Sequence, residues 1–436
     1  GPIQRILSSE NVADVEVVDV TEDRIVAEVS ALANTSFDVT TEVPIRVRLY
    51  RLSESDYVLA FVVQHISADG GSMAPLTRDL MVAYSARVAG AAPQWSPLEV
   101  QYADFALWQR RVLGREDDPS SVAYQQLSFW KSELAGLPDQ IALPTDRPRP
   151  AIQSFDGGRV DFSIDADVQA ALASLARAKN ATLFMAVHAA WAAVLTRLSG
   201  SSDVAVGSPI AGRGEAALDD LIGMFANTLV FRTEVDPAVS YQELVAEVRE
   251  ADVRALAHAD VPFERLVEVL NPARSTARHP LFQVGLSFQN LDTFEFELPG
   301  LAVSAVDADA EVAQFDLHLI VSDQYDDNGD PTGIGGTLKY SRALFDESSA
   351  RKIVDRLVAF VGAVADDPGL AVGDVEIMDE GERERVVRSW NETERAVDTA
   401  STLVSLFYAS VVASPQAVAL TFGSDSWTYA EFGSRV

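Results

Sequence analysis

The chain contains no cysteine, which excludes thiol nucleophiles, disulfides and cysteine-ligated zinc. Basic residues are few, since 34 Lys and Arg stand against 65 Asp and Glu, and the net charge is −31. Nucleic-acid binding needs cations that replace phosphate counterions, so this balance argues against a nucleic-acid partner. A reducing compartment fits the absence of cysteine, and we expect the protein in the cytoplasm.

Long hydrophobic runs are also scarce. The longest, at 181–195, contains His188 and falls short of the roughly 20 residues that a membrane-spanning helix needs. It therefore predicts a buried helix. The opening Gly-Pro-Ile-Gln-Arg lacks the basic start and apolar run of a signal peptide, and we expect no membrane partner.

Several catalytic signatures are missing as well. The sequence has no Gly-x-Ser-x-Gly elbow, no His-Glu-x-x-His zinc helix and no Gly-x-x-x-x-Gly-Lys phosphate loop. The glycine-rich segment 333–336 lacks the spacing of a dinucleotide site and is typical of a strand turn. We expect no metal.

Alternating strand and helix patterns over 436 residues predict an α/β protein with two lobes. The segment 143–150 (Leu-Pro-Thr-Asp-Arg-Pro-Arg-Pro) lacks a backbone donor at three positions and should be an extended linker between the lobes. We expect a first lobe at 1–145, a second lobe at 146–380, a linker at 381–400 and the start of a further domain at 401–436.

Residue patterns also place the main elements. Strands are expected at 15–18, 43–52, 57–65, 159–164 and 426–429, and helices at 21–32, within 74–134, at 166–178, at 183–198 and from about 402. Thr21 is the expected cap of the first helix. A polar Ser-Glu-Ser-Asp turn between 43–52 and 57–65 predicts a hairpin.

Of the five histidines, His65 has the neighbours that suggest chemistry. His188, in an alanine-rich helix, and His318, in an apolar strand, look structural. Both faces of the strand 57–65 are apolar, so we expect it to be buried on both sides and to carry His65 at its end, with Gln64 pointing into the lobe interior. Ser72 can cap the following helix, whose dipole would favour a neutral imidazole that accepts a proton from an amine.

The plainer interpretation of this segment is structural. Asp69 is a common turn residue, and paired glycines serve turns that need positive φ. A histidine followed by Asp-Gly is weak evidence when taken alone.

The neighbouring motifs strengthen the catalytic interpretation. Gln-His-Ile-Ser-Ala-Asp-Gly at 64–70 resembles the His-His-x-x-x-Asp-Gly core of nonribosomal peptide synthetase condensation domains. Further motifs similar to that family follow in its order: Tyr-Ala-Asp-Phe-Ala-Leu-Trp-Gln at 102–109, Ile-Gly-Met-Phe-Ala-Asn-Thr-Leu at 222–229, His-Ala-Asp-Val-Pro-Phe-Glu at 258–264, and Arg-Ser-Thr-Ala-Arg-His-Pro-Leu-Phe-Gln at 274–283. The resemblance covers nearly all of residues 1–385.

The resemblance implies two chloramphenicol-acetyltransferase-like lobes that form a pseudo-dimer with a central tunnel. The acceptor amine would attack the donor thioester directly, and His65 would abstract a proton, position the amine or stabilise charge. The Gly70 amide would donate to the developing oxyanion. Asp69 would be structural and held by Arg213, with Arg278 as second choice. The candidates for the tunnel wall are Ser72, Asn227, Thr228, His258, Gln289 and Asn290, and His258 is also a remote alternative base.

The resemblance further implies partners. Upstream and downstream peptidyl carrier domains would present both substrates on phosphopantetheine, and the condensation site would bind no cofactor of its own. Residues 403–407, 414–420 and 427–432 resemble the opening of an adenylation domain, which would act in cis with ATP and magnesium through residues beyond Val436. This order argues against an epimerisation domain. The Ser-Ala-Asp-Gly-Gly-Ser form suggests an L-configured donor.

Two departures from the family pattern matter. Gln64 replaces the leading histidine of the pair, and we expect a local cost in stability or activity from it. The chain also begins after the family's first helix, so we expect exposed apolar surface and poor activity from this fragment. The alternatives are a coenzyme A-dependent acyltransferase of the same superfamily and a degenerate scaffold that binds carrier domains, which Gln64 supports.

Overall fold

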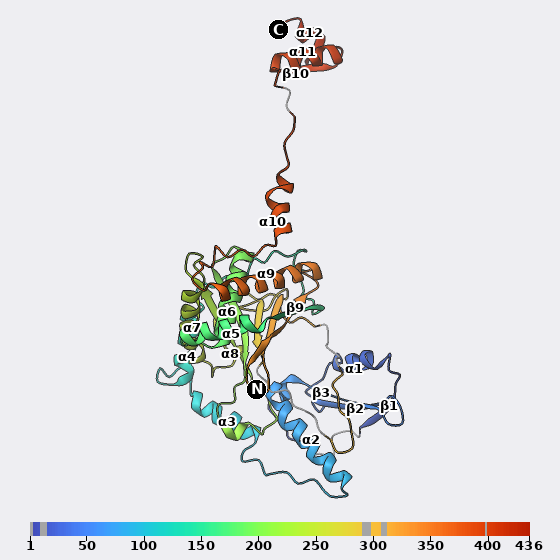
Figure 1. Ribbon diagram of the computed structural model, residues 1–436, viewed down its shortest axis with the longest axis vertical. Helices are drawn as coiled ribbons and strands as arrows, with labels where there is room; N and C mark the ends of the chain where they lie inside the picture. Colours follow the sequence, from blue (N-terminus) through green and yellow to red (C-terminus); the bar gives the residue numbers. More distant parts are fainter. Residues whose placement is uncertain (1–2, 9–14, 290–297, 307–311, 397–398) are drawn as a thin grey trace. The chain divides into compact units, whose positions relative to one another are not determined.

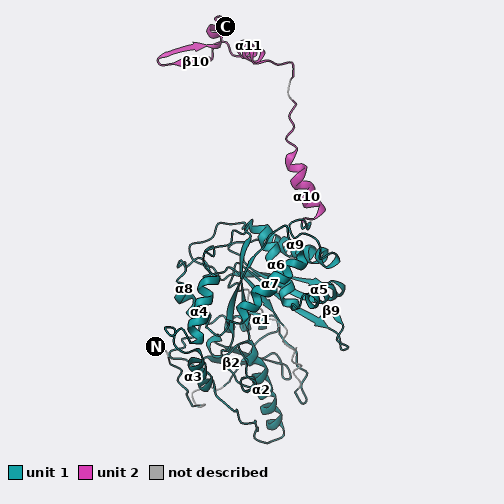
Figure 2. Ribbon diagram, turned by 90° about the vertical axis from the view of Figure 1, so that its left-hand side faces the viewer, with its two compact units in different colours: residues 1–377 teal, residues 378–436 magenta. Residues whose placement is uncertain are grey.

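The computed structural model describes residues 3–8, 15–289, 298–306, 312–396 and 399–436. The chain divides into two compact units, residues 1–377 and 378–436, which Figure 2 colours separately. We describe each unit by itself.

The first lobe is built on a three-stranded sheet in the order β1-β2-β3. Its strands are β1 (Glu16–Asp19), β2 (Ile45–Arg51) and β3 (Tyr57–Val63), and its helices are α1 (Ile25–Ala33) and α2 (Met73–Val88). Helix α3 (Tyr102–Leu113) follows, and its Phe105 packs with Leu218, Leu221 and Phe225 of the second lobe. Strands β2 and β3 pair antiparallel, which confirms the predicted hairpin, and β1 pairs parallel to β2. Helix α1 begins four residues later than Thr21, and Arg24 occupies its N-cap position. The prediction of a Thr21 cap is therefore wrong, because the Thr21 carbonyl instead accepts the Arg24 N–H in a preceding turn.

Strand β3 is covered on one face, contrary to the prediction of burial on both. Its even-numbered residues, including the buried Ala60, pack with α1 in a small core. On the opposite face Tyr57 and Leu59 are exposed. The apolar pattern of the strand did not distinguish these faces, because it does not reveal how many layers cover a sheet.

The second lobe contains a six-stranded mixed sheet in the order β4-β9-β8-β7-β5-β6. Its strands are β4 (Gly157–Ile164), β5 (Asp203–Ile210), β6 (Asn227–Glu234), β7 (Val284–Phe288), β8 (Leu317–Tyr325) and β9 (Pro331–Ser341). Strands β5, β7 and β8 run parallel to one another, and the remaining pairs are antiparallel. The predicted strand at 159–164 and helices at 166–178 and 183–198 are confirmed to within two residues.

Helices cover the two faces of this sheet unequally (Figure 1). The main core lies between one face and α5 (Ala166–Ala178), α6 (Leu183–Ser199), α7 (Tyr241–Leu256) and α9 (Glu347–Asp366). A second cluster joins α4 (Val122–Glu133) and α8 (Phe263–Leu270) to the edge strand β6. Trp130 of α4 and Phe231 of β6 belong to this cluster, so α4, which the sequence places in the first lobe, packs on the second.

Unit 378–436 is small. It comprises α10 (Glu380–Val387), α11 (Leu403–Ala413), the antiparallel pair β10 (Val418–Phe422) and β11 (Asp425–Thr428), and α12 (Tyr429–Gly433). Phe407 packs edge-on against Phe432, with 5.3 Å between ring centroids. Across the described residues of the whole chain, no helix taken singly has the length and apolar character to cross a membrane, although α5 and α6 pass on composition as a pair bent by 104°.

Candidate active site

The segment that follows β3 leaves the strand geometry after Gln64, whose backbone is still extended. There the backbone enters a short 3₁₀ turn, η2 (His65–Ser67), and the Gln64 Oε1 accepts the N–H of Ile66 at 2.6 Å. The prediction that the Gln64 side chain points into the lobe interior is wrong, because the side chain bends back along the chain to bond Ile66, although the Gln64 backbone is still extended. Gln64 caps its own turn instead.

His65 lies in this turn and is exposed, not at the end of a buried strand. Its Nδ1 is 2.9 Å from the carbonyl oxygen of Ala68. A carbonyl can only accept, so this contact assigns the proton of a neutral imidazole to Nδ1. The Nε2 atom then carries a lone pair that can accept a proton from another molecule.

Asp69 is buried and receives hydrogen bonds from five donors. Its Oδ1 accepts from the Ser72 N–H (2.9 Å), the Ser72 hydroxyl (2.8 Å) and Arg213 Nη2 (2.9 Å), and its Oδ2 accepts from the N–H groups of Phe225 (2.9 Å) and Ala226 (3.1 Å). Burial raises the pKa of this carboxyl, but the bonds from Arg213, Phe225 and Ser72 outweigh it and hold the pKa below the ordinary value of 3.8. Asp69 is therefore an ionised anchor between the two lobes.

Arg213 is the arginine that contacts Asp69. Its Nη1 donates to the carbonyls of Leu218 and Leu221, and its guanidinium lies 4.1 Å from the centre of the Phe225 ring. Arg278, the second choice, lies elsewhere and pairs with Asp139 at 3.4 Å. A Cβ on Gly71 would lie 2.9 Å from Arg213 Nε, so the glycine leaves the space that the arginine crosses.

Ser72 is fully buried in the same network rather than lining an open wall. Its hydroxyl oxygen accepts from the Gly223 N–H (3.1 Å) and from Arg213 Nη2 (3.0 Å). It completes the capping box of the turn η3 (Gly70–Ser72), whose N-cap is Asp69, and it makes no side-chain cap on α2, so the prediction that it caps that helix is wrong. Gly70, by contrast, is exposed, and a Cβ built on it would meet nothing within 4 Å.

Asn227 has no hydrogen-bonding capacity left for a substrate. Its Nδ2 donates to the carbonyls of Ala259 and Val261, and its Oδ1 accepts from the N–H groups of Phe263 and Thr228. These bonds use both donors and both acceptor positions of the amide. Asn227 thus fastens the 259–263 loop to the start of β6.

The remaining tunnel candidates occupy different places. Thr228 is partly buried beside Asn227 on β6, and Gln289 is exposed just after β7, where its N–H bonds the Val321 carbonyl at 2.7 Å. His258 stacks on Phe129 with ring centroids 3.8 Å apart and donates from Nδ1 to the Arg254 carbonyl. It is a packing residue of the α4–α7 contact in this structure. Asn290 lies outside the described residues.

Two donors to Asp69 lie outside the predicted site residues, on the segment that precedes β6. The backbone N–H groups of Phe225 and Ala226 bind its carboxylate, and Tyr102 donates its hydroxyl to the Met224 carbonyl at 2.8 Å. Burial, followed by the charge of Asp69, raises the pKa of Tyr102. Gly223 could have signalled the close approach, since a Cβ there would lie 2.3 Å from the Tyr102 ring.

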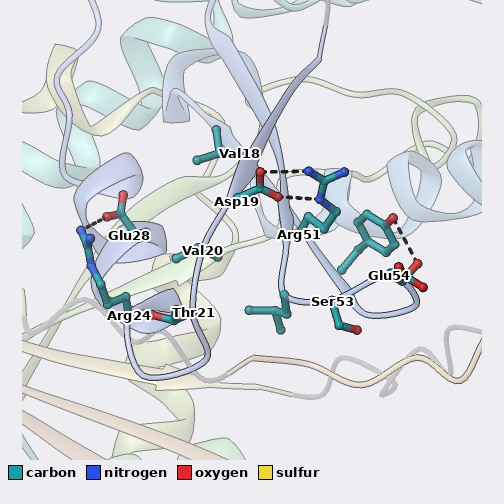
Figure 3. A pocket seen from close by; sticks show the side chains of 11 residues that line it. Val18, Asp19, Val20, Thr21, Arg24, Glu28, Arg51, Ser53 and Glu54 are labelled. Carbon is teal, nitrogen blue, oxygen red and sulfur yellow. Dashed lines mark hydrogen bonds and ion pairs between the residues drawn. The ribbon is translucent and has the colours of Figure 1, made fainter.

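A hollow of about 640 Å³ lies away from these residues, at the ends of β1 and β2 and the start of α1 (Figure 3). The Asp19–Arg51 and Arg24–Glu28 ion pairs line it, and it contains none of the candidate residues. Within the described part of the chain, no three His, Asp or Glu side chains are placed to hold a metal ion.

Comparison with known proteins gives a consistent family. The model of the Condensation domain family matches residues 1–387. The chain is 45% identical over 433 residues to the probable non-canonical nonribosomal peptide synthetase CymA of Salinispora arenicola, and 42% identical to a dimodular nonribosomal peptide synthase of Bacillus subtilis. Both alignments include 99% of this chain, but they include only 6% of the first relative and 18% of the second. The chain therefore spans less than a fifth of the length of these relatives.

Solved structures agree on the fold. The X-domain from teicoplanin biosynthesis is 37% identical with a TM-score of 0.79, over 84% of this chain and 82% of that one. The first condensation domain of the CDA synthetase, at 20% identity and a TM-score of 0.65 over 85% of this chain and 79% of that one, supports the fold alone. The predicted α/β architecture of two chloramphenicol-acetyltransferase-like lobes is confirmed. The chain belongs to the condensation domain family of nonribosomal peptide synthetases, a family of acyltransferases.

Proposed function

We propose that this domain forms an amide bond between an upstream carrier-bound acyl or peptidyl thioester and the amine of a downstream carrier-bound aminoacyl group. The observation that supports this most is the orientation of His65. Its Nδ1–H is fixed on the Ala68 carbonyl, its Nε2 is left as an acceptor, and the side chain is exposed. The buried Asp69–Arg213 pair holds the turn that carries it.

In this reaction the acceptor nitrogen attacks the thioester carbonyl, so a C–N bond forms and the C–S bond breaks. The amine loses one proton, and the departing sulfur gains one as the carrier thiol. Nε2 of His65 can take the first proton or hold the amine in line, and both roles use the same atom. The exposed Gly70 N–H is our candidate donor to the oxyanion that forms in between.

The partners follow from the same proposal. Carrier domains on either side would supply both substrates on phosphopantetheine, so the condensation site itself would need no cofactor. We propose that residues 401–436 open an adenylation domain in cis that uses ATP and magnesium. Their elements α11, β10, β11 and α12 form a separate unit from residues 1–377, in keeping with a domain change.

A second candidate is a recruiting domain without condensation activity. Gln64 stands where the family core has a histidine, and its amide is engaged in the backbone of η2. The similarity to X-domains, one of which was solved in a complex with OxyB, also favours this alternative. In that case the Asp69 network would stabilise the fold and would serve no catalytic purpose.

The test is a single-turnover condensation assay on the full-length protein that contains this chain, with both carriers loaded. We compare the unaltered protein with His65→Ala, Gln64→His and, as a matched control, His258→Ala. Loss of an acid–base group typically costs 10²–10⁴-fold, so His65→Ala should lower the rate at least about 100-fold, whereas His258→Ala should change it less than about threefold. Donors on coenzyme A should react poorly in comparison with carrier-bound donors.

Two outcomes would overturn the proposal. Product that forms equally well with His65→Ala would remove the histidine from the mechanism. A silent protein that Gln64→His restores would show that the glutamine disables the site and that the recruiting role is the present one.

A further inference from the structure

The sheet of the second lobe carries a polar pair on the face that the core helices do not cover. Ser287 of β7 and His318 of β8 are joined by a hydrogen bond between Oγ and Nε2 of 2.8 Å. Both side chains are partly exposed, although β7 and β8 are central strands of a six-stranded sheet. Their neighbours on the opposite face, Leu286, Leu317 and Leu319, are completely buried.

The strand register places this pair on the same face as the start of β6. Residues paired across strands share a face. Thr228 pairs with Pro209, Gly207 with Gly285, and Gly285 with His318. Ser287 follows Gly285 by two residues, so it lies on this face too, two strands from Thr228. Strands are about 4.8 Å apart, which puts Ser287 roughly 10 Å from Thr228.

A glycine makes room for the imidazole. A Cβ on Gly285 would lie 2.7 Å from His318 Cδ2 and 2.8 Å from the Phe315 ring. The ring can therefore lie against the sheet, where its Nε2 reaches Ser287. Because Gly285 needs no positive φ, close approach of the histidine and Phe315 is what favours a glycine here.

The chemistry of the pair suits a neutral polar group. Burial, and to a smaller extent Lys339, lowers the pKa of His318 to about 4, so the imidazole is neutral at pH 7. In one tautomer the Ser287 hydroxyl donates to Nε2 and its oxygen can accept from a ligand. In the other, Nε2–H donates to Ser287, whose hydroxyl proton turns outward. The pair can thus match an amide N–H or an amide carbonyl, while Lys339 on the same face disfavours a cation.

We propose that Ser287 and His318 contact a neutral side-chain carboxamide of the carrier-bound substrate and bias this domain toward such substrates. This inference rests on the proposed condensation function. It adds a specificity contact on the second-lobe sheet that is separate from the turn that holds His65.

The experiment uses the full-length protein and compares glutaminyl with norleucyl groups, presented in turn on the donor and on the acceptor carrier. The measured quantity is the ratio of kcat/KM for glutaminyl over norleucyl. Ser287→Ala and His318→Phe should each lower this ratio by about 3–10-fold on one carrier, the usual worth of a neutral hydrogen bond, mainly through KM. Ser287→Thr keeps the hydroxyl and should keep the ratio. Ser322→Ala, on the same face of β8, is the matched control and should leave the ratio unchanged.

A binding readout separates this inference from the proposed function. With histidine labelled by ¹⁵N, the imidazole signal of His318, assigned by its loss in His318→Phe, should shift when the pantetheine amide of glutamine is added. A protein that condenses no substrate but shows this shift would refute the condensation function and retain the contact. A protein that condenses normally, with the same substrate ratio in Ser287→Ala and Ser322→Ala, would refute the contact. A shift without any change in the ratio would also refute the proposed bias.

Discussion

Replacement of Asp69 by asparagine tests whether its carboxylate joins the two lobes. The carboxylate accepts from three donors at Oδ1, supplied by Ser72 and Arg213, and from two backbone N–H groups at Oδ2. Asparagine has one oxygen, and its NH₂ would face donors whichever way the amide is turned. At least two buried donors therefore lose their acceptor.

The expected cost follows from that count. Hydrogen bonds to a charged group contribute about 1.5–3 kcal/mol each, so two lost bonds should lower the free energy of unfolding by about 3–6 kcal/mol. A domain is typically stable by about 5–15 kcal/mol, so the change should be large in urea unfolding followed by tryptophan fluorescence. Condensation activity should fall with it, because the turn that carries His65 loses its anchor.

Glu116→Gln provides the matched control. Glu116 pairs with Arg265 through two bonds of 2.6 Å, but both side chains are about 40% exposed, so its loss should cost no more than about 1 kcal/mol. If Asp69→Asn costs as little as this control, the network does not hold the lobes together and our account of the site is wrong.

The same variant has a pH signature. The pKa of Asp69 is below 3.8 in the folded state, so its stabilising contribution is present above about pH 4 and is lost as the pH falls through the folded value. Asp69→Asn carries no ionisable group at this position. It should therefore lose less unfolding free energy than the unaltered protein between pH 5 and pH 3.

Two further predictions follow from the local geometry. Gly71→Ala should cost about 1–3 kcal/mol of unfolding free energy because its Cβ would lie 2.9 Å from Arg213 Nε. Gly70→Ala is the control and should be nearly neutral, since a Cβ there meets open space. Equal urea midpoints for the two variants would contradict the close packing at Gly71. The pKa of His318 is about 4 in the folded state against an ordinary 6.5, so as the pH falls the unfolded chain binds a proton at a higher pH than the folded chain does. The free energy of unfolding should therefore fall by up to about 3 kcal/mol between pH 6.5 and pH 4. His318→Gln should flatten that fall, and an unchanged slope in denaturant titrations at the two pH values would contradict the burial of a neutral imidazole.

Local signals in the sequence were sufficient for several elements. The turn Ser-Glu-Ser-Asp between two β-rich runs predicted the β2–β3 hairpin, and the helix 166–178 was predicted with both of its bounds. The Asp69–Arg213 contact came from family resemblance rather than from spacing, since 144 residues separate the two partners. Nothing in the local pattern around either residue indicates the other.

Other features depended on contacts distant in the sequence. The apolar alternation of β3 was the same on both faces, but α1 covers only the face that includes Ala60, and Leu59 is exposed. Gln64 was expected to point inward with that alternation, but its side chain instead caps η2, which begins at the next residue. Periodicity describes a strand while it lasts and does not mark where the backbone leaves it.

The sequence by itself determined the α/β class, the hairpin, the main helices and the segment that carries His65 and Asp69, because these depend on residue order over a few turns or strands. The tertiary structure decided which tautomer His65 presents, which arginine reaches Asp69, that Asn227 is fully bonded, and that Ser287 meets His318. Each of these depends on atoms brought within about 3 Å by the packing of separate elements, and hydrogen bonds form only at such distances and angles.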